Sequence, residues 1–238
     1  MIRIEFFHDV ICSFCFPMSA RMRRIAKKYN NIEIIHRSFA LGWEAEDFIR
    51  SFGSREAVKS EVLGHWVHAN QNDDEHRFNI EGMRQTDFNF PISKPGLIAA
   101  KAAGLIGGEN VYWDLFDRIQ NKLFVENKNI EDIAVLEEAV KETSISFSDW
   151  KAQFEKDETK KAVLADLGLV QAYGVNSAPT LVINQKYAIP GAQSQEEIEK
   201  VLAKISKDEG IPLSKLQTIQ TNDIAGACSI VDNKWQCD

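Results

Sequence analysis

Two cysteines near the start of the chain, in the stretch Cys12-Ser13-Phe14-Cys15, are the residues best placed to carry out chemistry. A pair with this spacing can exchange disulfides, close a structural bridge or supply half of a metal site. A structural zinc site usually adds a second close pair or histidines, but Cys228 and Cys237 are separated by eight residues at the far end of the sequence. We therefore expect no metal here and interpret the pair as redox-active.

The elements around the pair are predicted from hydrophobic periodicity. Residues 2–7 alternate as a strand, residues 15–29 have apolar side chains at helical spacing, and residues 32–39 form a second strand. The cysteines then lie at the start of the first helix, where unpaired N–H groups and the helix dipole favour a thiolate. This placement predicts that Cys12 is the exposed, attacking thiolate and that Cys15 is the buried thiol that resolves a mixed disulfide.

The rest of the chain changes character twice. Residues 44–156 show mostly helical periodicity, including a helix capped by Ser54. The last third contains a helix that ends at Gly174, two short strands with a turn at Asn184–Gln185, and a helix capped by Ser194. The predicted order is β-α-β, a helical insert, and α-β-β-α.

Three motifs in this order carry a family resemblance. "DVICSFC" at 9–15 is followed by "NSAPTLVIN" at 176–184 and "GAQSQEEIEKVL" at 191–202. The chain resembles the DsbA family of thiol-disulfide oxidoreductases, nearest its FrnE-like branch, which is related to the 2-hydroxychromene-2-carboxylate isomerases and kappa-class glutathione transferases. The resemblance implies an α/β class protein with a thioredoxin fold and an all-helical insertion domain.

The resemblance also divides the chain. It implies a thioredoxin-like domain from residues 1–43 and 157–207, interrupted by a helical insertion domain at 44–156. Residues 208–238 are left as a C-terminal tail that contains Cys228 and Cys237. These two cysteines could form a local disulfide, serve as a second redox pair that exchanges with the first, hold a metal or remain free thiols.

Site residues follow from the same resemblance. It implies that Cys12 and Cys15 are catalytic together with Pro179, which would be preceded by a cis peptide bond. The backbone of Ala178 would then lie beside Cys12 and pair with an extended substrate. Ser13 and Phe14, between the cysteines, would also contact substrate.

The predicted function is thiol-disulfide oxidoreduction through the Cys12–Cys15 motif on protein or small-molecule thiols and disulfides. A first alternative is a glutathione-dependent isomerase or transferase, although the first cysteine position is typically serine in that group. A second is a non-catalytic interaction or holdase module, which would leave both cysteines and Pro179 unexplained. We expect no tightly bound cofactor, and glutathione remains open as a co-substrate.

Two further features bear on the site. Asp9 could accept hydrogen bonds from the loop or handle a cysteine proton, and we favour the loop contacts. The helical insertion is expected to cover the cysteines and select the substrate, because it is rich in aromatic residues that suit an apolar binding surface. These aromatic residues are Trp43, Trp66, Phe78, Phe88 and Phe90.

Composition limits the partners. The 238 residues carry a net charge of −7, which argues against nucleic acid and anionic membranes as main partners. The basic stretch "RMRRIAKK" at 21–28 is interpreted as a solvated helix face. Met1 runs directly into a strand pattern without a signal-peptide pattern, so we expect a cytoplasmic protein; the oligomeric state is left open.

Overall fold

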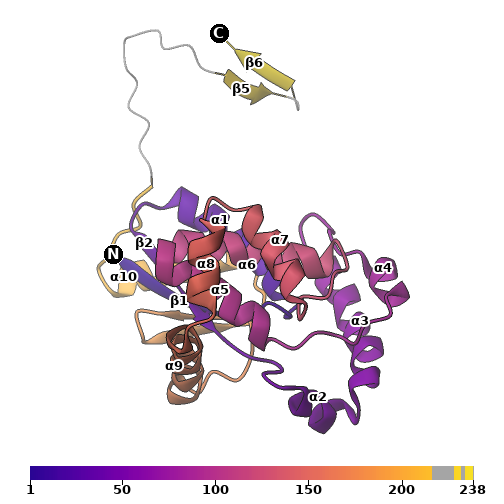
Figure 1. The fold of residues 1–238 in the computed structure, drawn as a ribbon. Coiled ribbons are helices and arrows are strands. Elements are labelled where there is room, and N and C mark those ends of the chain that lie inside the picture. The colour runs from indigo at the N-terminus through magenta and orange to yellow at the C-terminus, as the bar shows by residue number, and fades with distance from the viewer. Residues whose placement is uncertain (216–227, 232–233, 238) are drawn as a thin grey trace.

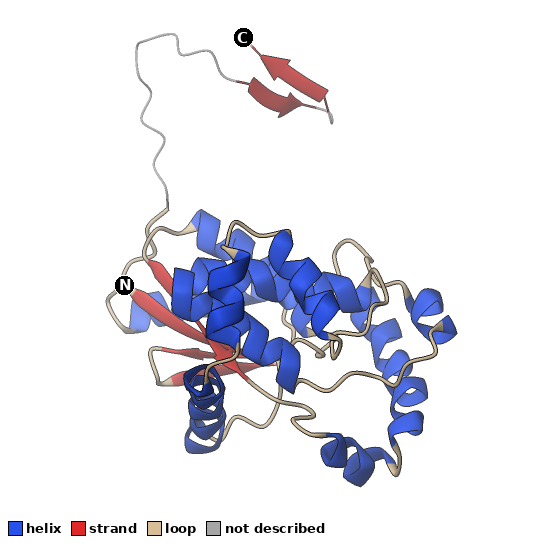
Figure 2. Ribbon diagram, in the orientation of Figure 1, coloured by secondary structure: helices blue, strands red, loops and turns tan. Residues whose placement is uncertain are grey.

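A four-stranded sheet forms the base of the fold (Figures 1 and 2). The computed structural model describes residues 1–215, 228–231 and 234–237. Strand β1 (Ile2–His8) pairs in parallel with β2 (Ile32–Ser38) and antiparallel with β3 (Thr180–Ile183), which pairs antiparallel with β4 (Tyr187–Pro190). The first and last thirds of the chain therefore meet in one sheet, in the order β2-β1-β3-β4.

Helices cover both faces of the sheet. Helix α1 (Cys15–Lys28) and helix α10 (Gln195–Asp208) pack their apolar stripes on the face that includes Ile2, Ile4 and Phe6. Phe7 points to the opposite face, where its ring meets Tyr173 of α9 (Asp157–Tyr173) edge-on. Because both faces are covered, every residue of β1 except Arg3 is buried, although apolar and polar residues alternate along most of the strand.

The insertion lies between β2 and α9. It has its own core, which includes the fully buried rings of Trp66, Phe116 and Trp150. Its helices are α2 (Ala45–Phe52), α3 (Arg55–Asn72), α4 (Ile80–Gln85), α5 (Lys94–Gly107), α6 (Glu109–Phe124), α7 (Ile133–Lys141) and α8 (Phe147–Phe154). None of the helices in the described part of the chain has both the length and the apolar character needed to cross a membrane.

Helix ends agree with the capping residues in the sequence. Ser54 accepts a hydrogen bond from the backbone of Ala57 at 3.3 Å, and Ser194 accepts one from Glu197 at 3.2 Å. Gly174 has φ +65°, a left-handed conformation that glycine adopts at no steric cost. Local chemistry therefore defines where these helices begin and end.

The tail begins as part of the thioredoxin-like unit. Ile211 and Leu213 pack against the core under α1 and α10, and the backbone of Ser214 accepts a hydrogen bond from Asn30 at 2.9 Å. Further along, β5 (Cys228–Val231) and β6 (Lys234–Cys237) form an antiparallel hairpin in which Cys228 lies opposite Cys237. Residues 216–227, 232–233 and 238 of the predicted tail lie outside the described residues.

Candidate active site

The two cysteines lie in a tight turn that leads from β1 into α1. The backbone N–H of Cys12 donates to the carbonyl of Asp9 at 3.1 Å, and the N–H of Cys15 donates to the carbonyl of Cys12 at 3.0 Å. Phe14 occupies the N-cap of α1, and no side chain caps this helix. The cysteine pair therefore lies at the start of α1, as the sequence predicted.

Cys12 is less exposed than the sequence predicted. Its exposed fraction is 4% and that of Cys15 is zero, so the expectation of an exposed Cys12 is wrong. Cys12 is covered by residues from three other parts of the chain. These are Leu41, which follows β2, Trp66 of the insertion, and Ala178, and all three line the space around Cys12. Cys12 is the more accessible of the two sulfurs, but it opens into a pocket rather than to bulk water.

Ala178 and Pro179 lie beside Cys12, as the family resemblance implied. The peptide bond between them is cis. The thiol of Cys12 donates to the carbonyl oxygen of Ala178 at 3.4 Å. Cys12 and Ala178, which are 166 positions apart in the sequence, therefore lie in contact.

Cys15 has the environment of a resolving thiol. Complete burial raises the pKa of Cys15 well above its ordinary value, and the adjacent Cys12 raises it further. Burial and the neighbouring sulfur therefore both favour the protonated form of Cys15. A thiol in this state becomes an attacker only when a partner disulfide forms next to it.

Asp9 holds the turn to two other segments. Its carboxylate accepts hydrogen bonds from the N–H of Ile11 at 3.2 Å, the N–H of Leu41 at 2.7 Å and the hydroxyl of Ser93 at 2.7 Å. These contacts confirm the expected loop role. Burial raises the pKa of Asp9 to about 6, although these hydrogen bonds act in the opposite direction.

Gln120, on α6 of the insertion, contacts the cysteine turn, which the sequence did not predict. Its side-chain amide donates to the carbonyl of Asp9 at 3.2 Å and to that of Cys12 at 3.4 Å, and the residue is fully buried. A glutamine beside the apolar stripe of a helix gives no sequence signal of such a role. Only the packing of α6 against the turn reveals it.

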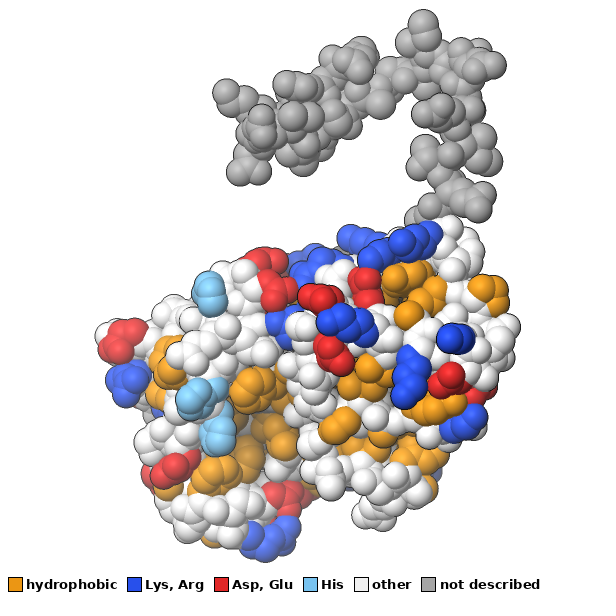
Figure 3. Space-filling view, turned by 180° about the vertical axis from the view of Figure 1, so that it is seen from behind, with side chains coloured by type: hydrophobic (Ala, Val, Ile, Leu, Met, Phe, Trp, Pro, Cys, Tyr) orange, Lys and Arg blue, Asp and Glu red, His pale blue; other side chains and the backbone are white. Residues whose placement is uncertain are grey.

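A mainly apolar pocket of about 310 Å³ opens beside Cys12. We call it the apolar pocket, and Figure 3 shows hydrophobic side chains gathered in a hollow on the side that carries α2 and α3. Its wall residues are Ile11, Phe14, Leu41, Phe48, Phe52, Val62, Trp66, Phe90 and Ala178, with Cys12, Ser13, Ser51 and His65 as the polar members.

The insertion supplies much of this wall, which agrees with the expectation that it covers the cysteines. Of the aromatic residues named from the sequence, Trp66 and Phe90 line the pocket. Phe78 packs in the insertion core instead, and Trp43 and Phe88 pack at the edge of that core. Ser13 and Phe14 line the pocket, as a substrate-contacting role requires.

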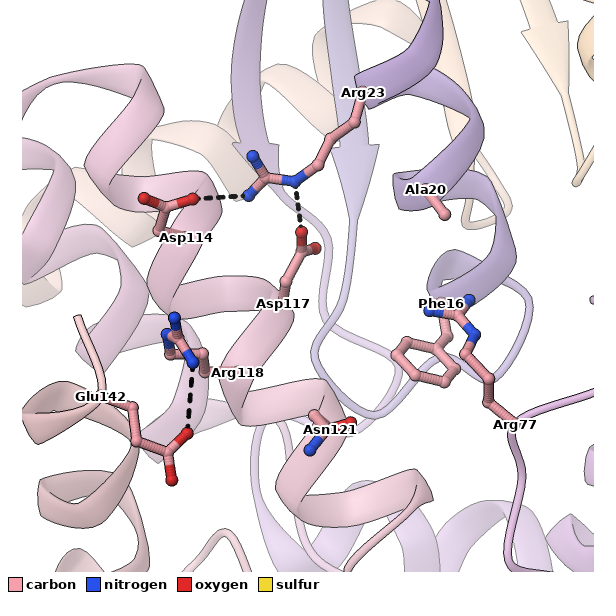
Figure 4. A pocket seen from close by; sticks show the side chains of 9 residues that line it. All are labelled: Phe16, Ala20, Arg23, Arg77, Asp114, Asp117, Arg118, Asn121 and Glu142. Carbon is pink, nitrogen blue, oxygen red and sulfur yellow. Dashed lines mark hydrogen bonds and ion pairs between the residues drawn. The ribbon is translucent and has the colours of Figure 1, made fainter. Parts of the chain in front are cut away.

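A second hollow, of about 400 Å³, lies between α1 and α6 (Figure 4). We call it the charged groove. Arg23 pairs with Asp114 and Asp117 across the two helices, and Arg118 pairs with Glu142 at 3.3 Å. The other residues that line it are Phe16, Ala20, Arg77 and Asn121.

The basic face of α1 is only partly solvated, contrary to the prediction. Arg21 is 3% exposed and donates to the side chain of Asn72 at 2.9 Å and to the carbonyl of Gln193 at 3.0 Å. It thereby joins α1 to the end of α3 and to the loop before α10. Buried arginines of this kind are retained where several acceptors converge.

In the part of the chain that the structure describes, the histidines and cysteines form no cluster that could hold a metal ion. Within residues 1–215 and the two short strands of the tail, no group of three or more His, Cys, Asp or Glu could hold a metal ion. His8 and His36 are buried, with His8 Nε2 and His36 Nδ1 3.2 Å apart. Burial lowers the pKa of both well below the ordinary value, so the pair is neutral at physiological pH.

Comparisons with known proteins agree with this fold. Over 88% of the chain, the structure superposes on 99% of a candidate protein disulfide isomerase from Nitrosomonas europaea, with a TM-score of 0.72 and 19% identity. The cytosolic disulfide reductase DsbM from Pseudomonas aeruginosa, solved with GSH, matches with a TM-score of 0.64 and 16% identity, over 84% of this chain and 98% of DsbM.

Two further proteins are similar to the chain, one in structure and one in sequence. A 2-hydroxychromene-2-carboxylate isomerase matches with a TM-score of 0.60 and 12% identity, over 87% of this chain and 98% of the isomerase. In sequence, the ClpXP adapter protein SpxH of Bacillus subtilis is 29% identical over 130 residues, which cover 51% of this chain and 43% of the adapter. The chain therefore matches less than half the length of that curated relative.

The family assignment rests on a match that spans both halves of the fold. The family model of the DSBA-like thioredoxin domain matches residues 3–203, which include the cysteine turn, the insertion and the Ala178–Pro179 loop. The chain belongs to the DSBA-like thioredoxin domain family.

Proposed function

We propose that the protein is a thiol-disulfide oxidoreductase with Cys12 as nucleophile and Cys15 as resolving thiol. The observation that carries the proposal is the arrangement at Cys12. Its sulfur lies 3.4 Å from the Ala178 carbonyl inside a pocket, while Cys15 is buried. One sulfur can thus meet an external disulfide, and the other can react only with the first.

The exchange balances as follows. The Cys12 thiolate attacks a substrate disulfide, a Cys12–substrate S–S bond forms, and the second substrate sulfur leaves as a thiolate that takes a proton from water. Cys15 then loses its proton to water and attacks the sulfur of Cys12, which breaks the Cys12–substrate bond and releases the first substrate sulfur as a thiolate that takes a proton from water. Two electrons pass from the protein dithiol to the substrate, and the reverse sequence oxidises a substrate dithiol.

A disulfide peptide that fluoresces on reduction tests the proposal. Wild type should catalyse its reduction by excess dithiothreitol, and Cys12→Ser should not. Reduced Cys15→Ser, freed of dithiothreitol and then mixed with the peptide, should accumulate a mixed disulfide at Cys12 that mass spectrometry detects. Catalysis that survives Cys12→Ser would refute the assignment.

Alkylation provides an independent test of the two roles. Iodoacetamide should modify Cys12 of the reduced protein well before Cys15, because burial and the neighbouring sulfur keep Cys15 protonated. Peptide mapping after short exposure would show the order. Earlier modification of Cys15 would reverse the assigned roles.

The glutathione-dependent isomerase alternative is supported by the likeness in fold to the 2-hydroxychromene-2-carboxylate isomerase. Such an enzyme would not require Cys15, so isomerisation of a hydroxychromene carboxylate by Cys15→Ser at the wild-type rate would favour it. The interaction-module alternative is supported by the partial match to SpxH. Partner binding that the Cys12→Ser, Cys15→Ser double variant retains would favour that function.

We also propose a cytosolic setting, which the likeness to a cytosolic disulfide reductase supports.

A further inference from the structure

The side-chain amide of Gln120 reaches the cysteine turn from the insertion. Its Nε2 group donates to the carbonyl of Asp9 at 3.2 Å and to the carbonyl of Cys12 at 3.4 Å. The same two carbonyls accept the backbone N–H groups that close the turn, those of Cys12 and Cys15. Gln120 therefore adds a second donor to each carbonyl oxygen rather than supplying the only one.

The other end of the same amide has no partner. Gln120 Oε1 is buried and accepts no hydrogen bond within the described part of the chain. Rotating the amide by half a turn would direct Oε1 at two carbonyl oxygens, so the donors stay on the side of the turn. An unpartnered buried acceptor lowers stability. This cost indicates that the amide has a role other than stabilising the fold.

Helix α6 holds this amide in a fixed position. Phe116, one turn before Gln120, packs against the ring of His8, the last residue of β1, with 3.8 Å between the ring centroids. Asp117, also on α6, accepts a hydrogen bond from Ser19 of α1. The insertion is thereby joined to the strand and to the helix that flank the cysteine turn, so the amide is fixed relative to both sulfurs.

The orientation of the amide favours negative charge at the cysteine pair. The NH₂ group is the positive end of the amide dipole, and it lies against the backbone carbonyl of Cys12 itself. Among the described residues that line the apolar pocket, none is Lys or Arg, so no side-chain cation there provides the same effect. The dithiol form supplies the Cys12 thiolate of the proposed reaction, whereas the disulfide carries no charge.

We propose that Gln120 is a positioning residue that favours the dithiol form of the Cys12–Cys15 pair over its disulfide. This inference rests on the proposed function and concerns the regulation of the same site. Through one amide, the insertion sets how strongly the cysteine pair oxidises its partners.

The test is the redox equilibrium with glutathione. The protein dithiol and one glutathione disulfide give the protein disulfide and two glutathione thiols, so two electrons and two protons pass to glutathione. Peptide mapping after acid quenching and alkylation counts the Cys12–Cys15 disulfide at several ratios of the two glutathione forms. Gln120→Met should raise the equilibrium constant for oxidation about threefold or more, because methionine keeps the length of the side chain but removes the donor.

A matched substitution locates the effect. Gln153, on α8, donates through its amide to the hydroxyl of Thr159 at 3.1 Å, and among the described residues no hydrogen bond joins it to residues 9–15. Gln153→Met should leave the equilibrium constant unchanged. An unchanged or lower constant in Gln120→Met, or an equal rise in Gln153→Met, would overturn the inference.

Urea denaturation separates this role from a structural one. Methionine removes the unpartnered Oε1 and leaves both carbonyls bonded to backbone N–H groups, so the urea midpoint of Gln120→Met should equal or exceed that of wild type. A markedly lower midpoint, or a failure to fold, would show that the amide serves stability and would also overturn the inference. A wild-type protein that forms no Cys12–Cys15 disulfide at any glutathione ratio would instead refute the proposed function.

Discussion

The apolar pocket and the charged groove border the same helix but differ in how their polar groups are used. Phe14, at the start of α1, lines the pocket, while Phe16, Ala20 and Arg23 line the groove. The groove is the larger hollow, about 400 Å³ against about 310 Å³. Yet its charged groups are paired within the chain, whereas the pocket holds a cysteine sulfur that can take a new partner.

The comparison shows that the volume of a hollow does not by itself make it a candidate site. What matters is whether a reactive group in it is not already paired with another group of the chain. Arg118 and Glu142, in the groove, are each more than 40% exposed and paired with each other. Such pairs contribute about 0–1 kcal/mol and join helices. In the pocket, apolar walls surround the sulfur of Cys12, an arrangement that suits the nucleophile we propose.

The largest expected difference between the two hollows is in activity. Cys12→Ser should reduce disulfide exchange to the uncatalysed rate, because no other sulfur lines the pocket among the described residues. Arg118→Ala, in the groove, should change the rate less than about twofold, as expected for an exposed ion pair. Reduction of a fluorescent disulfide peptide measures both. A large loss with Arg118→Ala would make the groove part of the site.

Substitutions in the pocket wall should also lower the free energy of unfolding more than substitutions in the groove. Trp66 is 1% exposed and is shared by the pocket wall and the insertion core, so Trp66→Ala should lower the free energy of unfolding by about 3–5 kcal/mol. Arg118→Ala should lower it by about 0–1 kcal/mol. Urea denaturation gives both values. Equal losses would mean that the groove stabilises the fold as strongly as the core does.

The free energy of unfolding should depend on pH through Asp9, whose carboxylate accepts hydrogen bonds from Ile11 and Leu41 of the pocket wall. Because the folded-state pKa of Asp9 is raised from 3.8 to about 6, the folded protein binds its proton more tightly, so this contribution is full below about pH 4 and is lost as pH rises through 6. Relative to Asp9→Asn, wild type should lose about 2 kcal/mol between pH 4 and pH 7. Paired urea titrations cancel the contributions of other groups.

The buried histidines provide the opposite dependence within the same experiment. Since burial lowers the pKa of His8 and His36, their contribution is present above about pH 6.5 and is lost as pH falls. It occurs in wild type and Asp9→Asn alike. A difference between the two proteins that does not change with pH would contradict the account of Asp9.

The smallest effect is expected in the tail, outside both hollows. Cys228 and Cys237 are opposite each other in the β5–β6 hairpin, and directly opposed residues have Cα atoms about 4.5–5.5 Å apart, within the range that a disulfide requires. We expect a local disulfide after mild oxidation, with a modest effect on stability because the loop it closes is short. Non-reducing peptide mapping would detect it; free thiols at both positions would contradict it.

Local signals in the sequence predicted most elements of the fold. Hydrophobic periodicity gave β1, α1 and β2 within one residue at each end. Ser54 and Ser194 begin helices and Gly174 ends one, for reasons visible in a few neighbouring residues. The short helices α2, α4 and α8 were not predicted individually, because six to eight residues carry little periodicity.

Contacts between distant segments explain what the sequence did not predict. Cys12 is covered because Leu41 and the insertion meet over it, and Arg21 is buried because acceptors from α3 and the loop before α10 converge on it. Gln120 reaches the turn across 108 positions of sequence. None of these partners lies within a helical turn of the residue it affects, so no local pattern could indicate them.

The insertion both holds the cysteine turn and lines the apolar pocket, and different helices do each. Ser93, at the start of α5, and Gln120, on α6, hold the cysteine turn, whereas among the described residues no hydrogen bond joins α2 or α3 to residues 9–15. Phe52 and Val62, on α2 and α3, face the pocket. Mutations there can alter which disulfides enter while the geometry of the sulfurs stays fixed, so substrate range can evolve separately from the reaction.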